Sequence, residues 1–326
     1  MDIREVKDRP ALEHFHAVES ASLDHDHVAL PADPLEEHLP VVLGEQPSGE
    51  HVTYLCGYAD GVPVSAVTIT TWTLDNLTSA NVEVRVHPDH RRRGYGRAMT
   101  EHALDLVRSA GRNRVFIETP WLPDGSEGPA FPLLRSLGAK EVLVDVRRLL
   151  DLQQFPVGAP SAVPDGYRLE QWVDVAPDEV VDGLAYLMHR MVLDAPMGEM
   201  DYEAEKWDAA RYRESEASAM RRNRRRLTSV VVHEDSGEVA GMTELAVNGE
   251  RHDVGYQWNT IVDPRHRGKG LGMVLKSWNH RNLVETFPAA RWVNTWNAAS
   301  NSFMIEVNER LGFRPAERWS EWQLDL

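Results

Sequence analysis

The sequence predicts an α/β protein that contains two similar domains in tandem. Its 326 residues suffice for about two domains of roughly 100–200 residues each. One segment occurs twice with the same internal spacing, and each copy lies between a predicted strand and a predicted amphipathic helix. Apolar residues make up 42% of the chain, which is enough for ordinary cores. We therefore expect one copy of the same functional unit in each domain.

The repeated segment is a strand end, a glycine-rich loop and a helix start. It reads VEVRVHPDHRRRGYG over residues 82–96 and NTIVDPRHRGKGLG over residues 259–272. The matching residues are Pro88 and Pro264, Arg91 and Arg267, Gly94 and Gly270, and Gly96 and Gly272. A loop of this kind directs several backbone N–H groups at one point, where the helix dipole also favours negative charge. Glycines permit a positive φ and a close approach of the ligand. The repeat therefore predicts two phosphate-binding loops.

The pattern Arg-x-x-Gly-x-Gly after a Val-x-Pro strand end resembles the acyl-CoA loop of the GNAT superfamily of N-acetyltransferases. The second half also carries Asn297-Ala298-Ala299-Ser300-Asn301 and later Leu311-Gly312-Phe313. These are similar to the family's later motif, an asparagine followed by a helix that ends in Leu-Gly-Phe. The resemblance covers both halves and is better in the second. It implies two tandem domains, each with a mixed, mostly antiparallel sheet, a splayed parallel strand pair and flanking helices.

The resemblance also implies acetyl-CoA as the cofactor, with its pantetheine arm between the splayed strands. Backbone groups of these strands would bond the arm's amides as an added strand would. The residues expected to contact the cofactor in the first copy are Val86, Arg91, Arg92, Arg93, Gly94, Tyr95 and Gly96. Those expected in the second are Val262, Arg267, Gly268, Lys269, Gly270, Leu271, Gly272, Asn297 and Asn301.

The first half, residues 1–150, begins with a short strand. The further expected elements are helices over 11–20 and 34–39, strands over 51–58, 62–72 and 82–86, a helix from Gly96 to Gly111, and a strand over 114–119. Asp33 is the expected cap of the second helix, with Pro34 at its first position. The helix after Gly96 should bury Met99, Ala103, Leu106 and Ala110. The segment Asp24-His25-Asp26-His27 is either a metal or acid–base cluster or a solvated loop.

The first half departs from the family pattern after residue 119. Prolines and glycines crowd residues 120–132 and leave room only for a short helix over 131–138. Leu134 stands four positions before Gly138, where many family members have a catalytic tyrosine. We therefore expect the later motif of the first domain to be degenerate.

Residues 151–166 form the predicted linker, since Pro156, Pro160 and Pro164 alternate there with small residues. The second domain, residues 167–326, should hold helices over 178–192 and 203–226, strands over 229–233, 239–247 and 256–262, a helix from Leu271, a strand over 292–296, a helix up to Leu311 and a closing strand over 319–326. The basic run 221–226 is either a phosphate contact or the cationic end of a helix.

Acyl transfer from a thioester to an amine needs a base that takes a proton from the amine. Glu244 is the candidate in the second domain and Glu83 in the first, because each lies on a strand that could reach the cofactor. Asn308 occupies the tyrosine position four before Gly312, and an amide cannot supply a proton to the leaving thiolate. Either the thiolate leaves unaided, or Tyr256 or another group supplies the proton, or this domain performs no transfer.

The sequence features bear on three functions. The first is an acetyl-CoA-dependent N-acetyltransferase that acts on a primary amine of a small molecule. The alternative is an acyl-CoA-binding sensor without turnover, because the loop predicts the cofactor and not the reaction. A Rossmann dinucleotide site is disfavoured, because Arg-x-x-Gly-x-Gly differs from Gly-x-Gly-x-x-Gly.

The composition limits the partners. The net charge of −16 argues against nucleic acid and suits a cationic acceptor. The single Cys56 excludes an intramolecular disulfide and fits a reducing compartment. The start of the chain lacks the apolar core of a signal peptide, and no run approaches the roughly 18 apolar residues of a membrane span. We expect a cytoplasmic monomer or homodimer.

Overall fold

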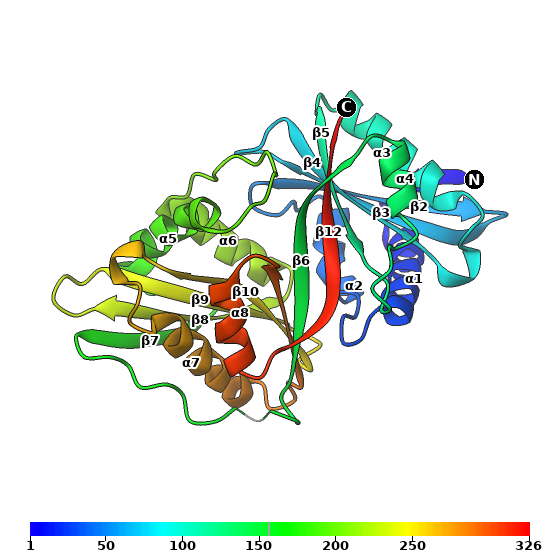
Figure 1. The fold of residues 1–326 in the computed structure, drawn as a ribbon. Helices are drawn as coiled ribbons and strands as arrows, with labels where there is room; N and C mark the ends of the chain where they lie inside the picture. Colours follow the sequence, from blue (N-terminus) through cyan, green and yellow to red (C-terminus); the bar gives the residue numbers. More distant parts are fainter. Residues whose placement is uncertain (156) are drawn as a thin grey trace. The chain divides into compact units, whose positions relative to one another are not determined.

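The computed structural model describes residues 1–155 and 157–326 (Figure 1). The chain divides into two compact units, each made of separate stretches. Unit 1 consists of Met1–Val146, Met197–Glu203 and Glu317–Leu326, and unit 2 of Arg147–Pro196 and Ala204–Ala316. Pro156, one of the prolines of the predicted linker, lies outside the described residues. The predicted domain limits, 1–150 and 167–326 with a linker between them, remain a prediction. Compact units and repeated sequence segments need not end at the same residues.

The sheet of unit 1 combines antiparallel strand pairs with a parallel pair. Its strands, in spatial order, are β1 (Asp2–Glu5), β2 (Glu50–Ala59), β3 (Val62–Trp72), β4 (Ser79–Val86), β5 (Arg114–Pro120), β12 (Arg314–Asp325) and β6 (Lys140–Asp151). Strands β4 and β5 are the parallel pair. Asp60 and Gly61, both with positive φ, make the predicted two-residue turn between β2 and β3. The closing strand β12 pairs antiparallel with β5 along Trp319–Asp325.

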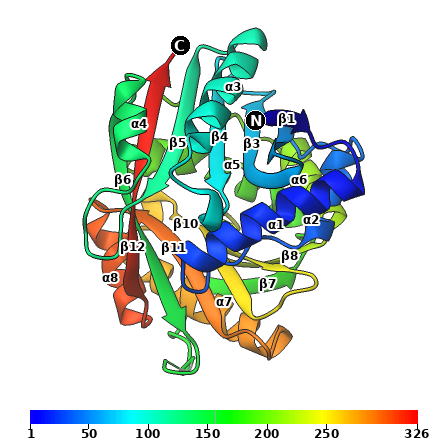
Figure 2. The ribbon, with the colours of Figure 1, turned by 90° about the vertical axis from the view of Figure 1, so that its right-hand side faces the viewer.

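Helices cover both faces of this sheet (Figure 2). They are α1 (Arg9–Asp26), α2 (Leu35–Val42), α3 (Tyr95–Ser109) and α4 (Phe131–Ser136). Alternate residues of one strand serve the two faces, as the pleat requires: Leu55 packs into the core of α3 and α4, whereas Tyr54 and Cys56 pack against α1. The predicted apolar face of α3 was wrong in its second half. Leu106 and Ala110 are exposed, and Leu104 and Val107 are buried instead.

Unit 2 repeats this plan. Its strands, in spatial order, are β11 (Trp292–Ala298), β10 (Val254–Val262), β9 (Val239–Asn248), β8 (Arg224–His233) and β7 (Tyr167–Val173). Its helices are α5 (Val181–Asp194), α6 (Ala209–Arg221), α7 (Leu271–Thr286) and α8 (Ser302–Arg310). Val230 and Val232 face α5 and α6, whereas Val231 between them faces α7. Three short 3-10 turns are η1 (Pro88–His90), η2 (Asp178–Val180) and η3 (Pro264–His266).

The helix predicted over 203–226 was wrong at both ends. Asn223 takes a φ of 54°, and the chain continues as strand β8 from Arg224. Arg221 and Arg222 therefore stand at the C-terminal end of α6, as one of the two interpretations predicted, whereas the rest of the basic run, from Arg224, belongs to β8. Arg225 donates from Nε to Asp174 Oδ2 at 2.8 Å, and Arg226 is buried among carboxylates. Asp174 and Glu244 are distant in sequence from these arginines. Because they neutralise the arginines, the charged segment can form a strand inside the unit.

The first two helices also differ from their predicted bounds. Helix α1 runs to Asp26, so the Asp24–His27 segment is a helix end rather than a loop. No group of three metal-ligating side chains occurs anywhere in the described residues. Helix α2 begins after Pro34, and no side chain caps it, so Asp33 is not the predicted cap. Within residues 1–155 and 157–326, no helix is long and apolar enough to span a membrane.

Candidate functional site

Each unit holds one parallel strand pair that separates part of the way along. Strands β4 and β5 pair only from Ser79–Asn81 to Arg114–Phe116, although both run on for several residues. Strands β10 and β11 pair only over Val254–Tyr256 and Trp292–Asn294. Beyond these pairs the facing backbone groups of the two strands have no ladder bonds to each other. The splayed parallel pair expected from the resemblance is therefore confirmed in both units.

The two predicted loops have nearly the same backbone. In each, a 3-10 turn follows the strand, and a glycine in the left-handed region starts the helix. The φ of this glycine is 86° at Gly94 and 75° at Gly270. No side chain caps α3 or α7, so the first N–H groups of each helix remain open at the loop. A Cβ added to Gly94 or Gly270 would meet no atom within 4 Å. Each loop thus leaves space and free donors for an anion.

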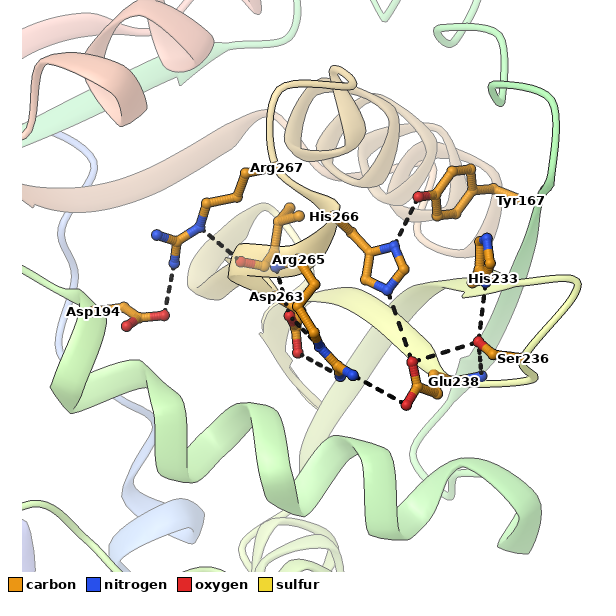
Figure 3. A network of polar contacts seen from close by, with 10 residues as sticks. Tyr167, Asp194, His233, Ser236, Glu238, Asp263, Arg265, His266 and Arg267 are labelled. Carbon is orange, nitrogen blue, oxygen red and sulfur yellow. Dashed lines mark hydrogen bonds and ion pairs between the residues drawn. The ribbon is translucent and has the colours of Figure 1, made fainter.

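The signature arginine of each loop is bonded to the protein. Arg91 donates from Nε to the Val86 carbonyl at 3.0 Å, and its Nη atoms donate to the two Asp26 carboxylate oxygens at 2.7 Å. Arg267 donates from Nε to Val262 O at 3.0 Å and from Nη2 to Asp194 at 2.6 Å (Figure 3). Asp26 is the last residue of α1, and Asp194 is the last residue of α5. The arginines therefore fix the loop to the fold, and the backbone N–H groups of the helix start are left as the donors of the loop.

Burial opposes the charge of Asp26, but hydrogen bonds from Arg91 and His25 outweigh it and lower the pKa of this carboxyl. Asp26 was predicted only as part of a possible metal or acid–base cluster, and Asp194 was not among the predicted site residues. Their only sequence signal is a carboxylate in the last turn of a helix, and sequence spacing alone does not pair that carboxylate with a loop.

The other loop side chains differ between the units. Arg92 and Arg93 are exposed and have no polar partner in the described part of the chain. At the matching place in unit 2, Gly268 replaces Arg92, and Lys269 donates to Tyr167 Oη at 2.8 Å. Tyr95 and Leu271 occupy the first helical turn behind the glycine, as do Gly96 and Gly272.

A polar network supports the loop of unit 2 from below (Figure 3). Tyr167 Oη lies 2.8 Å from His266 Nδ1, and Arg265 bonds to both Asp263 and Glu238. Asp263 is fully buried; burial opposes its charge, but the Arg265 and Tyr186 bonds outweigh burial and lower its pKa to about 2. These bonds hold the turn η3 (Pro264–His266), which connects β10 to the glycine loop.

Strand β10 has a bulge that β4 lacks. Its pairing with β9 shifts register between Gln257 and Thr260, whereas β4 pairs with β3 without interruption. Asn259, on the bulge, donates from Nδ2 to Glu244 Oε2 at 2.8 Å. Glu244 also accepts from Tyr212 Oη at 3.1 Å and lies 3.4 Å from Arg226. With 1% exposure and three partners, the predicted base of unit 2 is enclosed.

The predicted base of unit 1 has different surroundings. Glu83 lies two residues beyond the last parallel pair, and 42% of its side chain is exposed. Desolvation raises its pKa, and the nearby carboxylates of Glu118, Glu19 and Asp33 add to the rise, against Arg85. Because the side chain keeps this exposure, solvent moderates the shift. Glu83 therefore combines a raised pKa with access to solvent, two features of a general base.

Asn297 and Asn308 belong to a buried chain of contacts. Lys276 Nζ donates to Asn308 Oδ1 at 2.5 Å, and Asn308 Nδ2 donates to Asn297 Oδ1 at 2.6 Å. Asn301 accepts from Met304 N at 3.2 Å and caps α8, as predicted. Tyr256 is half-buried in the last parallel pair, opposite Asn294. The structure thus places Tyr256, Asn297 and the loop beside one splay, and encloses Asn308 behind it.

These features define a tandem protein in which two splayed strand pairs each lead into a glycine loop and an uncapped helix start. A model of the Acetyltransferase (GNAT) family matches residues 20–120 and 192–313. The chain therefore belongs to the GNAT family of N-acetyltransferases, as a member with two tandem domains. GNAT acetyltransferases in general use acetyl-CoA.

Several known proteins are similar to this chain. The mycothiol acetyltransferase of Cellulomonas flavigena is 30% identical over 247 residues, which cover 72% of this chain and 64% of that protein. The chain thus matches less than two thirds of that relative's length. The mycothiol acetyltransferase of Saccharomonospora viridis is 26% identical over 255 residues, 72% of this chain and 71% of the relative. A solved tandem GNAT protein from the clavulanic acid biosynthesis pathway superposes with a TM-score of 0.83 at 26% identity, over 99% of this chain and 98% of the other.

Proposed function

We propose that the protein is an acetyl-CoA-dependent N-acetyltransferase that acts on an amine of a small molecule. The observation that carries the proposal is the twice-built loop. In each unit an open helix start, a left-handed glycine and a tied-back arginine follow a strand that separates from its parallel neighbour. Free N–H groups and the helix dipole suit the diphosphate of coenzyme A, and the gap between strands suits the pantetheine arm.

The residues present fit the coenzyme at both loops. Gly94 and Gly270 leave the space that a diphosphate needs, since an added Cβ there meets nothing. Arg92 and Arg93 offer two further cations in unit 1, and Lys269 offers one in unit 2. When bound, acetyl-CoA supplies an activated acetyl thioester. The protein's own part is to hold the coenzyme, to orient the acceptor and to take a proton from the amine.

We place the transfer centre in unit 1, beside Glu83. Strands β4, β5, β12 and β6 carry Glu83, Glu118, Glu321 and Asp145. Burial raises the pKa of Glu83, Asp145 and Glu321, and the negative charge of Glu118 raises each of these three further. Asp145 reaches a pKa of about 6, mainly because it is buried and also because of Glu118. When its carboxyl is ionised, Glu83 attracts a cationic amine and can accept its proton, and its raised pKa makes it a stronger base. Glu244 of unit 2 is enclosed by its three partners, so we expect it neither to attract the amine nor to accept its proton.

A second candidate function, coenzyme binding without turnover, is favoured in unit 2 by one observation. Asn308 takes the place of the proton-donating tyrosine and is fully buried against Lys276. We propose that unit 2 holds the coenzyme and performs no transfer.

The test is calorimetry with acetyl-CoA on the full chain, together with a thiol-release assay on a panel of small amines. Gly94→Glu should abolish turnover and remove one binding site, because a side chain and a negative charge would both oppose the diphosphate. Gly270→Glu should remove the other binding site and leave turnover. If only Gly270→Glu abolishes turnover, the centre lies in unit 2. If both variants bind as the parent does, the assigned loops are wrong.

A further inference from the structure

A fully buried lysine lies behind the splay of unit 2. Lys276, in the second turn of α7, is 1% exposed and touches the face of Phe313, with Nζ 5.4 Å from the ring centre. In the part of the chain that the structure describes, its Nζ has one hydrogen-bond partner, Asn308 Oδ1 at 2.5 Å. Burying an ammonium with one partner is costly. Because Asn308 is this partner, the effect of Lys276 on its surroundings passes through the Asn308 amide.

A lysine fixes which way an amide points. Because Nζ only donates, it requires the oxygen of Asn308, and the amide nitrogen must then face the other way. It donates to Asn297 Oδ1 at 2.6 Å. The oxygen of Asn297 is thereby used, and its own Nδ2 has no partner among the described residues. One lysine thus determines the orientation of two successive amides.

The free donor lies where a ligand is expected. Asn297 is on β11, three residues beyond its last parallel pair with β10, and it is half-buried. Helix α8 starts beside the loop, since a Cβ on Gly272 would lie 4.0 Å from Phe303. Asn297 therefore flanks the gap between the strands, close to the glycine loop.

We propose that Lys276 is a positioning residue of the coenzyme site in unit 2, which turns the Asn297 amide nitrogen outward to donate to a carbonyl of the pantetheine arm. The proposal rests on the proposed coenzyme site. Lys276 itself touches no ligand and acts through Asn308. Its effect should therefore disappear when Asn297 is removed.

The charge of Lys276 adds a second observable. Burial lowers the pKa of Lys276 to about 7, and His280, one turn away on α7, is held neutral with a pKa of about 3 by burial and by Lys276. The charged form donates the stronger bond to Asn308. The orientation of both amides is therefore firmest below about pH 7 and weakens above it.

A double-mutant cycle on the full chain tests the proposal. All variants carry Gly94→Glu, so that calorimetry with coenzyme A reports unit 2 alone. Lys276→Met and Asn297→Ala should each weaken binding about tenfold, the equivalent of one good hydrogen bond, and the double variant should be no weaker than Asn297→Ala. Losses that multiply to about a hundredfold, or unchanged binding by Lys276→Met, would overturn the proposal.

Asn308→Asp is a second variant that does not depend on the fate of Lys276→Met. The new carboxylate still accepts from Lys276 but cannot donate to Asn297, so binding should again fall about tenfold. In the parent, affinity should fall between about pH 6 and about pH 8.5 relative to Lys276→Met, whose profile reports the titration of coenzyme A itself. Parallel profiles would contradict the role of Lys276. If the parent does not bind, the proposed coenzyme site of unit 2 fails as well.

Discussion

The two loops differ in backbone conformational energy at Arg92, which occupies the place of Gly268. It holds a φ of 64°, whereas Gly268 holds 79° at the matching place. A left-handed conformation costs a non-glycine residue about 1–2 kcal/mol, and glycine avoids that cost. An exposed arginine retained there is consistent with a contact to an anionic ligand.

Arg92→Gly should therefore raise the free energy of unfolding by about 1 kcal/mol while it weakens coenzyme binding in unit 1. Thermal denaturation and calorimetry measure the two effects. Gly268→Ala is the matched control and should lower stability by a similar amount, since an added Cβ there meets no atom and only the φ matters. A less stable Arg92→Gly would show that the side chain stabilises the free protein.

Glu83→Gln should lower kcat by about a hundredfold or more, because the amide cannot take a proton from the amine. In the parent, activity should rise with pH through the raised pKa of Glu83, since the base must be deprotonated; the variant should lose this limb. Glu101→Gln, at an exposed position of α3, is the control and should keep the parent profile. An unchanged pH profile in Glu83→Gln would assign the proton to another group.

Some residues of the site could be predicted from the sequence and others could not. The glycines could, because positive φ restricts the choice of residue. Lys276 could not be predicted, because a lysine on a helix is usually exposed and the residues next to it in the sequence do not indicate a contact with Asn308. Arg91 and Arg267 were predicted as ligand contacts, and the structure gives them carboxylate partners that no local pattern reveals.

At the scale of elements, the pairing of β5 with β12 brings two carboxyl groups face to face. Glu118 and Glu321 are direct cross-strand partners, and Glu321 is 9% exposed. Burial raises the pKa of Glu321 well above its usual range, and its hydrogen bond and repulsion with Glu118 raise it further. Glu321 is therefore protonated in the fold at neutral pH.

Glu321→Gln should stabilise unit 1 at high pH and have little effect at low pH. The folded pKa exceeds the unfolded one, so the parent is most stable below about pH 4.5 and loses stability as pH rises above it. Glutamine stays neutral and keeps a donor for Glu118. We expect a gain of about 1 kcal/mol or more near pH 8, a shift of about 2–4 °C in Tm. An equal gain near pH 4 would contradict the linkage.

Elements defined by local pattern were predicted better than those fixed by distant partners. The turn at Asp60-Gly61, the two loops and the Asn301 cap all follow from residues within a few positions. The helix over 203–226 failed because Asp174, Glu216 and Glu244 neutralise Arg225 and Arg226 inside a strand. Charge alone predicted a solvated helix there.

At the scale of the whole molecule, the two halves of the chain are not the two units. Residues 197–203 and 317–326 belong to unit 1 although they follow the first half by many positions. Apolar alternation showed that residues 319–326 form a strand. It did not show which sheet the strand joins, because alternation carries no information about the partner.

The last strand should therefore stabilise the first unit. Trp322 is 2% exposed in the core of α3 and α4, and its Nε1 donates to Thr119 Oγ1 on β5 at 2.9 Å. Trp322→Ala should cost about 3–5 kcal/mol, because it opens a large cavity and leaves Thr119 unpaired.

Hydrogen exchange on the full chain locates that loss. Amides of β5 should exchange faster in Trp322→Ala, while those of β8 and β9, which unit 2 holds, should keep their protection. Asp325→Ala, an exposed position of the same strand, should change stability by less than about 0.5 kcal/mol. Faster exchange confined to β8 and β9 would mean that the end of the chain stabilises unit 2, and the division of the chain into these units would be wrong.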